Sequence, residues 1–258
     1  MTFSLRSANL RSLNSLTKYP SIPTYHTLGE RGRLGEPAIA FDGPVVGSEK
    51  VDGTNARMVF LPDGTYLLGS REEWLCASDD LIGNPALGIV EHLRPVADAL
   101  REKRLDAGGI TVVFGEVYGG NVTAHSKQYT GDKRVGYRVF DVVRLTDFET
   151  PLAWSGEQLS GWRESGGQPF ISEDALQVFT REHGLELTPR IFEQDGSALP
   201  KDLEGAFAFL RTHVPTTRCA LDAGAGQHTE GLVVRTRDRR TIAKMRFEDY
   251  ERTLRVKR

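Results

Sequence analysis

Apolar residues recur along this chain with two different spacings, which predicts a mixture of strands and helices. The antiparallel pairing of strands is indicated by their turns: Asp63-Gly64 is a favourable tight turn, and a short charged turn separates the last two strands. The strands are predicted over residues 45–50, 56–61, 65–69, 110–117, 136–143, 231–236 and 241–247.

Helical spacing is found in two longer segments. Residues 86–104 carry apolar side chains three and four positions apart, with Pro95 as a kink or a restart. Ser172 is a suitable N-cap for a second helix that ends at His183, because Gly184 follows at the position where a left-handed residue ends many helices.

A third helix is expected over residues 202–214, whereas residues 20–35, rich in Pro and Gly, are expected to be irregular. Helices and antiparallel hairpins are therefore mixed along the chain without a regular strand–helix alternation. This order is typical of the α+β class.

Composition is that of an ordinary globular protein and excludes a membrane span. The 258 residues are 39% hydrophobic and 26% charged, and no apolar run approaches the roughly 20 residues that cross a bilayer. Cys76 and Cys219 have no metal-binding spacing, and none of the six histidines does either, so we expect reduced thiols and a cytoplasmic protein. Residues 1–29 contain no acid, which is typical of a transit peptide but fits the basic start of a folded domain better.

Charge is distributed unevenly although the formal net charge is only −2. From Arg235 to the end of the sequence, ten Lys and Arg residues stand against four Asp and Glu residues. This stretch predicts a phosphate-facing surface, with a solvated helix face as the alternative.

A lysine between a predicted strand and a glycine turn is the most informative feature of the sequence. It lies in the stretch Glu49-Lys50-Val51-Asp52-Gly53-Thr54-Asn55. Lysine is a nucleophile only when neutral, and burial or a neighbouring cation favours that form. Taken alone, the pattern is more typical of an exposed lysine before an ordinary Asp-Gly turn.

Five stretches in a fixed order resemble the motifs of the covalent lysine nucleotidyltransferases, which include ATP-dependent ligases and mRNA capping enzymes. The lysine loop resembles motif I, and its Thr54-Asn55 is the form seen in the RNA ligase branch. The other matches are residues 114–119 for motif III, 137–141 for motif IIIa, 230–235 for motif IV and 243–246 for motif V.

This resemblance implies a three-step reaction. Lys50 takes AMP from ATP, AMP passes to a nucleic-acid 5′-phosphate, and a 3′-hydroxyl then seals the strand. Lys244 and Arg246 would contact the phosphates, although the family often has lysine at the second position. Glu116 and Glu230 would hold Mg²⁺, for which Mn²⁺ could substitute, and Glu116 could instead hold the ribose.

The remaining roles concern the nucleotide. Phe140 would stack on adenine, Glu49 would accept a hydrogen bond from the adenine amino group, and Asn55 and Arg71 would contact the nucleotide or the 5′-phosphate. Arg57 fits a phosphate contact and a surface charge equally well.

The resemblance also predicts the architecture: a single nucleotidyltransferase (adenylyltransferase) domain over residues 1–258, with antiparallel sheets flanked by helices and the nucleotide in the cleft between them. Only 12 residues follow Arg246, so no appended OB-fold or other C-terminal domain is expected, and a partner protein could supply that surface. We expect an ATP-dependent RNA ligase core that acts on RNA or RNA/DNA hybrid ends. The alternatives are a DNA nick ligase or capping-type guanylyltransferase, and a non-catalytic nucleotide- or RNA-binding module.

Overall fold

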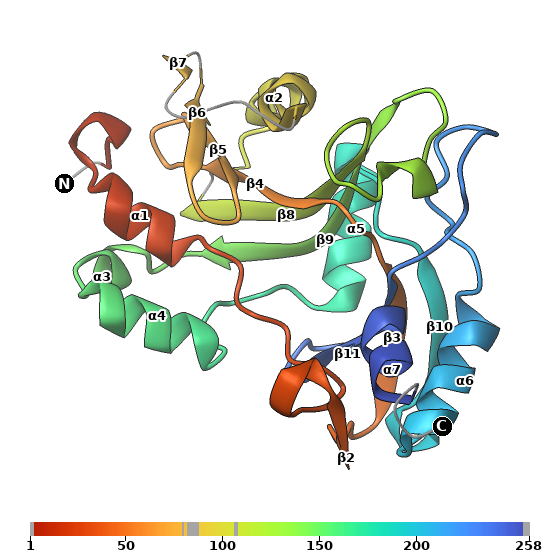
Figure 1. Ribbon diagram of the computed structural model, residues 1–258. Coiled ribbons are helices and arrows are strands. Elements are labelled where there is room, and N and C mark those ends of the chain that lie inside the picture. Colours follow the sequence, from red (N-terminus) through yellow and green to blue (C-terminus); the bar gives the residue numbers. More distant parts are fainter. Residues whose placement is uncertain (1–2, 79, 82–87, 106–107, 255–258) are drawn as a thin grey trace.

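Three antiparallel sheets organise the molecule (Figure 1), for which the computed structural model describes residues 3–78, 80–81, 88–105 and 108–254. The larger sheet has six strands in the order β7-β6-β5-β4-β8-β9. The smaller sheet has four strands in the order β10-β3-β11-β12, and β1 pairs with β2 alone. The larger sheet comprises β4 (Thr54–Phe60), β5 (Tyr66–Ser70), β6 (Trp74–Ala77), β7 (Asp80–Leu81), β8 (Ile110–Gly119) and β9 (Val135–Leu145). The other strands are β1 (His26–Leu28), β2 (Leu34–Ala38), β3 (Pro44–Lys50), β10 (Arg190–Asp195), β11 (Gly231–Thr236) and β12 (Ile242–Arg246).

Seven α-helices and several short 3₁₀ turns surround the sheets in the described ranges. The helices are α1 (Leu10–Leu16), α2 (Ile89–Arg101), α3 (Glu149–Leu152), α4 (Gly156–Glu164), α5 (Glu173–His183), α6 (Leu203–His213) and α7 (Phe247–Leu254). The 3₁₀ turns include η1 (Leu5–Ser7), η2 (Glu30–Gly32), η4 (Ser126–Gln128) and η5 (Gly196–Ala198).

The larger sheet is buried on both faces. One face packs on α2 and α5 through residues such as Leu93 and Phe179, and the other packs on α1 and α4 through Leu16 and Leu159. Burying each such side chain stabilises the fold by about 1.5–3 kcal/mol before entropy is counted. A sheet covered on both sides explains why its central strands are continuous apolar runs.

The smaller sheet packs its apolar face on α6 and α7, where Leu210 and Tyr250 are buried against Leu232 and Met245. Its central strand β3 lies between β10 and β11, and the chain passes from β3 through the lysine loop directly into β4 of the larger sheet. The lysine loop is therefore a connection between the two sheets.

An N-terminal segment, residues 19–25, also connects the two sheets. It leaves α1 beside the larger sheet and descends to the β1–β2 hairpin beside the smaller one (Figure 1). Pro23 O accepts a hydrogen bond from Lys244 N at 2.9 Å, and Tyr25 N donates one to Lys244 O at 2.8 Å. The segment thus covers the edge strand β12.

The α+β class and all the predicted strands and helices are confirmed, with shifts of a few residues at their ends. Ser172 caps α5 by accepting a hydrogen bond from Ala175 N, and Gly184 ends it in the left-handed conformation. Helix α2 continues through Pro95; the expected residues 86–87 lie outside the described ranges.

The expectation of irregular chain over residues 20–35 is wrong in part. His26 pairs with Ala38 and Leu28 pairs with Leu34, so β1 and β2 form a small hairpin around η2. Residues 23–25 are in turn held by backbone pairing with Lys244 of β12, despite the local Pro content. None of the described helices has the length and apolar character that a membrane crossing needs.

Candidate active site

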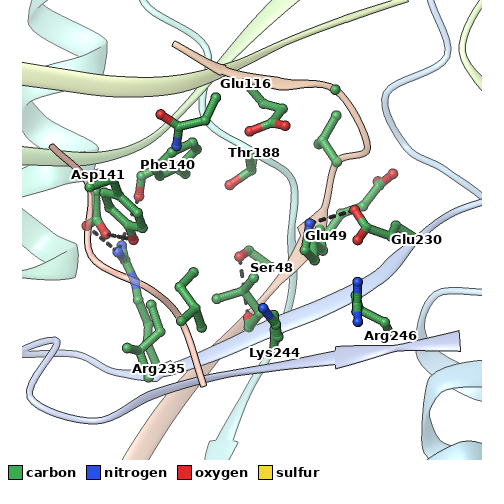
Figure 2. A pocket seen from close by; sticks show the side chains of 18 of the residues that line it. Ser48, Glu49, Glu116, Phe140, Asp141, Thr188, Glu230, Arg235, Lys244 and Arg246 are labelled. Atoms are coloured by element: carbon green, nitrogen blue, oxygen red, sulfur yellow. Dashed lines mark hydrogen bonds and ion pairs between the residues drawn. The ribbon is translucent and has the colours of Figure 1, made fainter. Parts of the chain in front are cut away.

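A cavity of about 490 Å³ lies where the two sheets meet, and all nine sequence-predicted site residues line it. Figure 2 shows Phe140 and Asp141 at one end of the cavity and Glu230 and Arg246 at the other. We call these the Phe140 end and the Lys50 end, because Lys50 contacts Glu230. The nine residues are Glu49, Lys50, Asn55, Arg71, Glu116, Phe140, Glu230, Lys244 and Arg246.

Lys50 ends β3, and its register on β11 places it opposite Gly231. The Nζ atom donates a hydrogen bond to Glu230 Oε2 at 2.6 Å, and both side chains are about one fifth exposed. Burial raises the pKa of Glu230, and the neighbouring ammonium of Lys50 opposes that shift. The structure therefore places the predicted nucleophile in direct contact with a carboxylate that holds protons more tightly than usual.

Two cations project from β12 near this pair. Lys244 and Arg246 are two positions apart on a strand, so they share one face. Burial lowers the pKa of Lys244, and the charges of Arg246 and Lys50 lower it further. Arg246 donates to both oxygens of Asp249 at 2.7 and 2.8 Å, a partner in α7 that the sequence did not indicate.

Glu116 and Asn55 face each other across β8 and β4 beside the lysine loop. Burial raises the pKa of Glu116 to about 8; Lys50 opposes this shift and Glu230 adds to it. Gly53 is required here, because a Cβ atom would lie 2.3 Å from Val117 O and 2.9 Å from Glu116 Cγ. Asn55 Oδ1 is buried without a hydrogen-bond partner.

These oxygen atoms suit a hard divalent cation. Glu116, Glu230 and the unpaired Asn55 Oδ1 supply the carboxylate and amide oxygens that Mg²⁺ and Mn²⁺ prefer. Across the described ranges, however, no three His, Cys, Asp or Glu side chains form a ready-made metal cage. The residues fit an ion that takes its other ligands from water and phosphate.

A β-bulge shapes the Phe140 end. Phe114 pairs with Asp141, whereas Gly115 pairs with Val139, so Phe140 is the extra residue in β9. The bulge lets two neighbours, Phe140 and Asp141, line the same cavity. The ring of Tyr19 packs edge-on against Phe140 at 4.9 Å.

Behind Phe140 lies a buried ionic cluster. Asp141 accepts hydrogen bonds from Tyr19 Oη at 2.6 Å, Arg235 Nη1 at 2.7 Å and Arg239 Nε at 2.8 Å. Arg235 also pairs with Glu173, which Arg190 contacts at 2.8 and 3.0 Å. Burial alone would raise the pKa of Glu173, but Arg190 and Arg235 outweigh it and lower the pKa to about 2.

This cluster corrects the expectation of a C-terminal phosphate-facing surface. Apart from Lys244, every cation from Arg235 to Arg252 pairs with a carboxylate, a statement that covers the described part of this stretch. Arg235, Arg237 and Arg239 form ion pairs that join β11 and the turn after it to β9, α5 and β10. The three cations beyond residue 254 lie outside the described residues.

Glu49 has partners within the protein in addition to its place in the cavity lining. Its carboxylate is 1% exposed and accepts hydrogen bonds from the Thr217 hydroxyl and from Arg218 N at 2.7 Å. Alternation along β3 turns Glu49 away from the face that carries Ser48 and Lys50. The side chain therefore anchors the 217–218 segment, and an adenine amino group would share the carboxylate oxygens with these two donors.

Arg57 is neither a phosphate contact nor a surface charge. It is fully buried, lies 4.4 Å from the centre of the Trp74 ring, and donates a hydrogen bond to Asn14 O at 3.1 Å. Burial lowers its pKa to about 9. Strand β4 thus places the buried Arg57 side chain against α1.

Arg71 is half-exposed at the rim of the cavity, where its Nη2 atom donates to Ser21 Oγ at 3.3 Å. Ser21 belongs to the segment that the sequence described only as Pro- and Gly-rich. Sequence reasoning missed this wall of the cavity, and it gave no role to Asp141 or Arg235 although both lie inside quoted motifs. The added lining residues include Tyr19, Ser21, Ile22, Asp141, Thr188, Val233, Arg235 and Ile242.

Two sheets with a lysine-centred cavity at their junction define an α+β domain of the nucleotidyltransferase type. The family model described as RNA ligase matches residues 43–247, and the chain therefore belongs to the RNA ligase family. No curated protein sequence matches the chain significantly.

Solved structures share the fold at low sequence identity. An apo variant of Naegleria gruberi RNA ligase superposes with a TM-score of 0.55 at 11% identity, over 81% of this chain and 51% of that one. An archaeal ATP-dependent RNA ligase gives 0.54 at 15% identity, over 91% and 49%. A Naegleria gruberi variant with ATP and Mn gives 0.55 at 11% identity, over 90% and 63%. The chain thus spans about half the length of the first two structures.

Proposed function

We propose that this protein is the catalytic core of an ATP-dependent RNA ligase and that Lys50 carries AMP as a covalent intermediate. The observation that carries the proposal is the contact between Lys50 Nζ and Glu230 Oε2 in a cavity that also contains Lys244 and Arg246. A nucleotide-binding module without catalysis has no need for a lysine held in this way. RNA ligase family membership favours this reading over a DNA nick ligase or a capping guanylyltransferase.

In the first step, Lys50 Nζ bonds to the α-phosphorus of ATP while the bond from that phosphorus to pyrophosphate breaks. Lys50 must first lose its ammonium proton to water, and the hydrogen bond to Glu230 Oε2 at 2.6 Å holds Nζ in place. Lys244 and Arg246 neutralise charge on the phosphates, since phosphoryl transfer depends mainly on positioning and electrostatics. Glu116 and Glu230 would hold Mg²⁺, or Mn²⁺ in its place, which would neutralise further charge on the triphosphate.

The nucleotide base would lie at the opposite end of the cavity. Phe140 offers a ring face for stacking, which contributes about 1–3 kcal/mol per base in other proteins. Asn55 Oδ1 is a buried acceptor without a partner and suits a ribose hydroxyl or the hydrated metal ion. Glu49 remains the proposed acceptor for the adenine amino group, which would share its carboxylate with Thr217 and Arg218.

In the later steps, a 5′-phosphate oxygen attacks the phosphorus of lysyl-AMP and releases Lys50. A 3′-hydroxyl then attacks the 5′-phosphorus of the end, and AMP leaves. We infer that the ends are RNA or RNA/DNA hybrids, with ribose required on the 3′-hydroxyl side. Arg71 lies at the rim of the cavity beside the N-terminal segment of residues 19–25, and we propose that it contacts the 5′-phosphate.

Labelled ATP and Mg²⁺, followed by denaturing electrophoresis, test the first step. We expect an acid-labile, base-stable adduct that peptide mass spectrometry maps to Lys50. Equal labelling by GTP would revive the capping alternative. Pre-adenylated RNA and DNA ends at nicks and single strands test the last step, and equal sealing of an all-DNA nick would rule out the RNA assignment.

A further inference from the structure

The lysine loop rests on a small core of its own. Val51 is 4% exposed and packs with Tyr118, Tyr129 and Cys219, apart from the cores of the two sheets. Lys50 therefore faces the cavity while the next residue in the chain is fixed in the opposite direction. The residues that fix this small core therefore also fix the position from which the Lys50 side chain extends into the cavity.

Tyr129 contacts the loop backbone directly. Its side chain is fully buried, and its hydroxyl oxygen accepts a hydrogen bond from Asp52 N at 2.6 Å. The Tyr118 ring packs edge-on against it at 4.9 Å. Burial raises the pKa of Tyr129, so the phenol stays neutral and keeps its geometry at any ordinary pH.

A second chain segment fixes Tyr129 in turn. Leu221 N donates to Tyr129 O at 2.7 Å, and Gln227 N donates to Gln128 O at 3.0 Å. Residues 217–230, which carry Glu230 at their end, thus pair with the η4 segment along its backbone. The segment that supplies the carboxylate partner of Lys50 also positions the tyrosine behind it.

His125, the residue before η4, contacts the Asp52 side chain. His125 Nδ1 lies 2.7 Å from Asp52 Oδ2, with the imidazole mostly exposed. Water competes for a contact at an exposed side chain, so this contact is the weaker of the two. The hydrogen bond from Asp52 N to the buried Tyr129 side chain is the stronger constraint on the loop.

We propose that Tyr129 is a positioning residue for the reaction of Lys50, a role that rests on the function proposed above. Its hydroxyl sets the backbone of Asp52 and thereby the approach of Lys50 Nζ to the phosphorus. Reacting atoms must approach within about 3–3.5 Å, and a misplacement of about 1 Å can cost a hundredfold in rate.

The test compares Tyr129→Phe with Tyr66→Phe. Tyr66 is a matched control, because it is also fully buried and its hydroxyl donates to Asp98 at 2.7 Å, in the core of the larger sheet away from the cavity. Hydrogen exchange over residues 50–55 is measured first, without nucleotide. We expect roughly tenfold faster exchange in Tyr129→Phe and no change in Tyr66→Phe.

The second measurement is the rate of Lys50 adenylylation at saturating ATP. Tyr129→Phe should slow it by about ten- to a hundredfold with little change in KM for ATP, whereas Tyr66→Phe should retain the rate even if its thermal stability falls as far. His125→Ala should slow it less than Tyr129→Phe does.

The outcomes separate the two proposals. Unchanged exchange in Tyr129→Phe overturns the role of Tyr129, whether or not the protein labels with AMP. Faster exchange with a normal labelling rate shows a structural contact without a catalytic consequence and also overturns it. A wild-type protein that never labels contradicts the proposed function, while the exchange comparison still decides whether Tyr129 holds the loop.

Discussion

The two ends of the cavity are built in different ways. At the Phe140 end, Asp141 and Glu173 are almost completely buried and three arginines surround them. At the Lys50 end, one ion pair is partly exposed, Lys244 pairs with no described carboxylate, and Glu116 has a raised pKa. The first end is electrostatically complete without a ligand, and the second is not.

This difference indicates a division of labour. Buried ion pairs with every partner in place fix the relative position of the strands that carry them, and they lose much when one partner is removed. Incompletely paired charges are costly to the fold and are found where a ligand completes them. The Phe140 end should therefore respond to mutation through stability, and the Lys50 end through chemistry.

The largest effect should come from Lys50→Ala. Removing the proposed nucleophile should abolish the AMP adduct, because Lys244, the other lysine that lines the cavity, lies on β12 and is assigned to the phosphates. Circular dichroism and urea unfolding should show a folded protein with a much smaller loss of stability than Asp141→Ala causes. If Lys50→Ala still formed the AMP adduct in full yield, Lys50 would not be the residue that carries AMP.

Asp141→Ala should cause the largest loss of stability. It leaves Arg235 and Arg239 buried without their shared partner, and breaking a buried pair costs about 3–5 kcal/mol. Urea unfolding measures the change. Asp238→Ala is the control, since its pair with Arg240 is exposed and should contribute about 0–1 kcal/mol. Equal losses in both variants would remove the contrast between the two ends.

Glu116→Gln should change how stability depends on pH. Because the pKa of Glu116 is raised from 4.5 to about 8, the folded state binds a proton that the unfolded state has lost across that range. The contribution of this group is therefore complete below about pH 4.5 and declines as pH rises towards 8. The difference between wild-type and Glu116→Gln unfolding free energies should fall over this window, and a constant difference would contradict it.

Arg57→Met should cost about 1–3 kcal/mol in unfolding free energy and leave labelling unchanged. The substitution keeps most of the volume but loses the contact with Trp74 and the hydrogen bond to Asn14. If Arg57→Met lost the AMP adduct at normal stability, the result would contradict the purely structural role of Arg57 and support a phosphate contact.

The smallest effects concern the nucleic acid. Lys127, Lys133 and Arg134 are exposed, and within the described residues they form no ion pair. Replacing one of them with Gln should weaken RNA binding a few-fold and reduce the salt dependence by about one charge. Arg240→Gln, at a cation already paired with Asp238, should change neither. Fluorescence anisotropy at several salt concentrations gives both quantities.

Sequence indicated the parts of the site that local pattern determines. The lysine loop and the two cations of β12 were identifiable because a strand, a turn and an alternating spacing place them within a few residues of each other. The α+β class followed from the hairpins in the same way. Arg57 was misjudged because an arginine in an alternating strand gives no sign of the tryptophan that covers it.

The rest depends on contacts between distant residues. Tyr19 and Asp141 are 122 positions apart, and Arg235 and Asp141 are 94 apart, so no local pattern announces that they meet. The tyrosine lies in a Pro-rich segment whose course is set by backbone bonds to Lys244. No sequence pattern indicates the bulge at Phe140 either, although the bulge determines which side chains of β9 face the cavity.

The long sequence separation within the smaller sheet has a consequence for how the protein is made. Lys50 and Glu230 are 180 positions apart, and β3 has both its sheet partners in residues 190–236. A ribosome adds about 5–20 residues per second, so β3 waits roughly ten seconds or longer for them. The larger sheet needs only residues 54–145 and can pair first. A growing chain would thus complete the larger sheet early, whereas Lys50 and the other residues of the candidate site come together only after translation has passed β12.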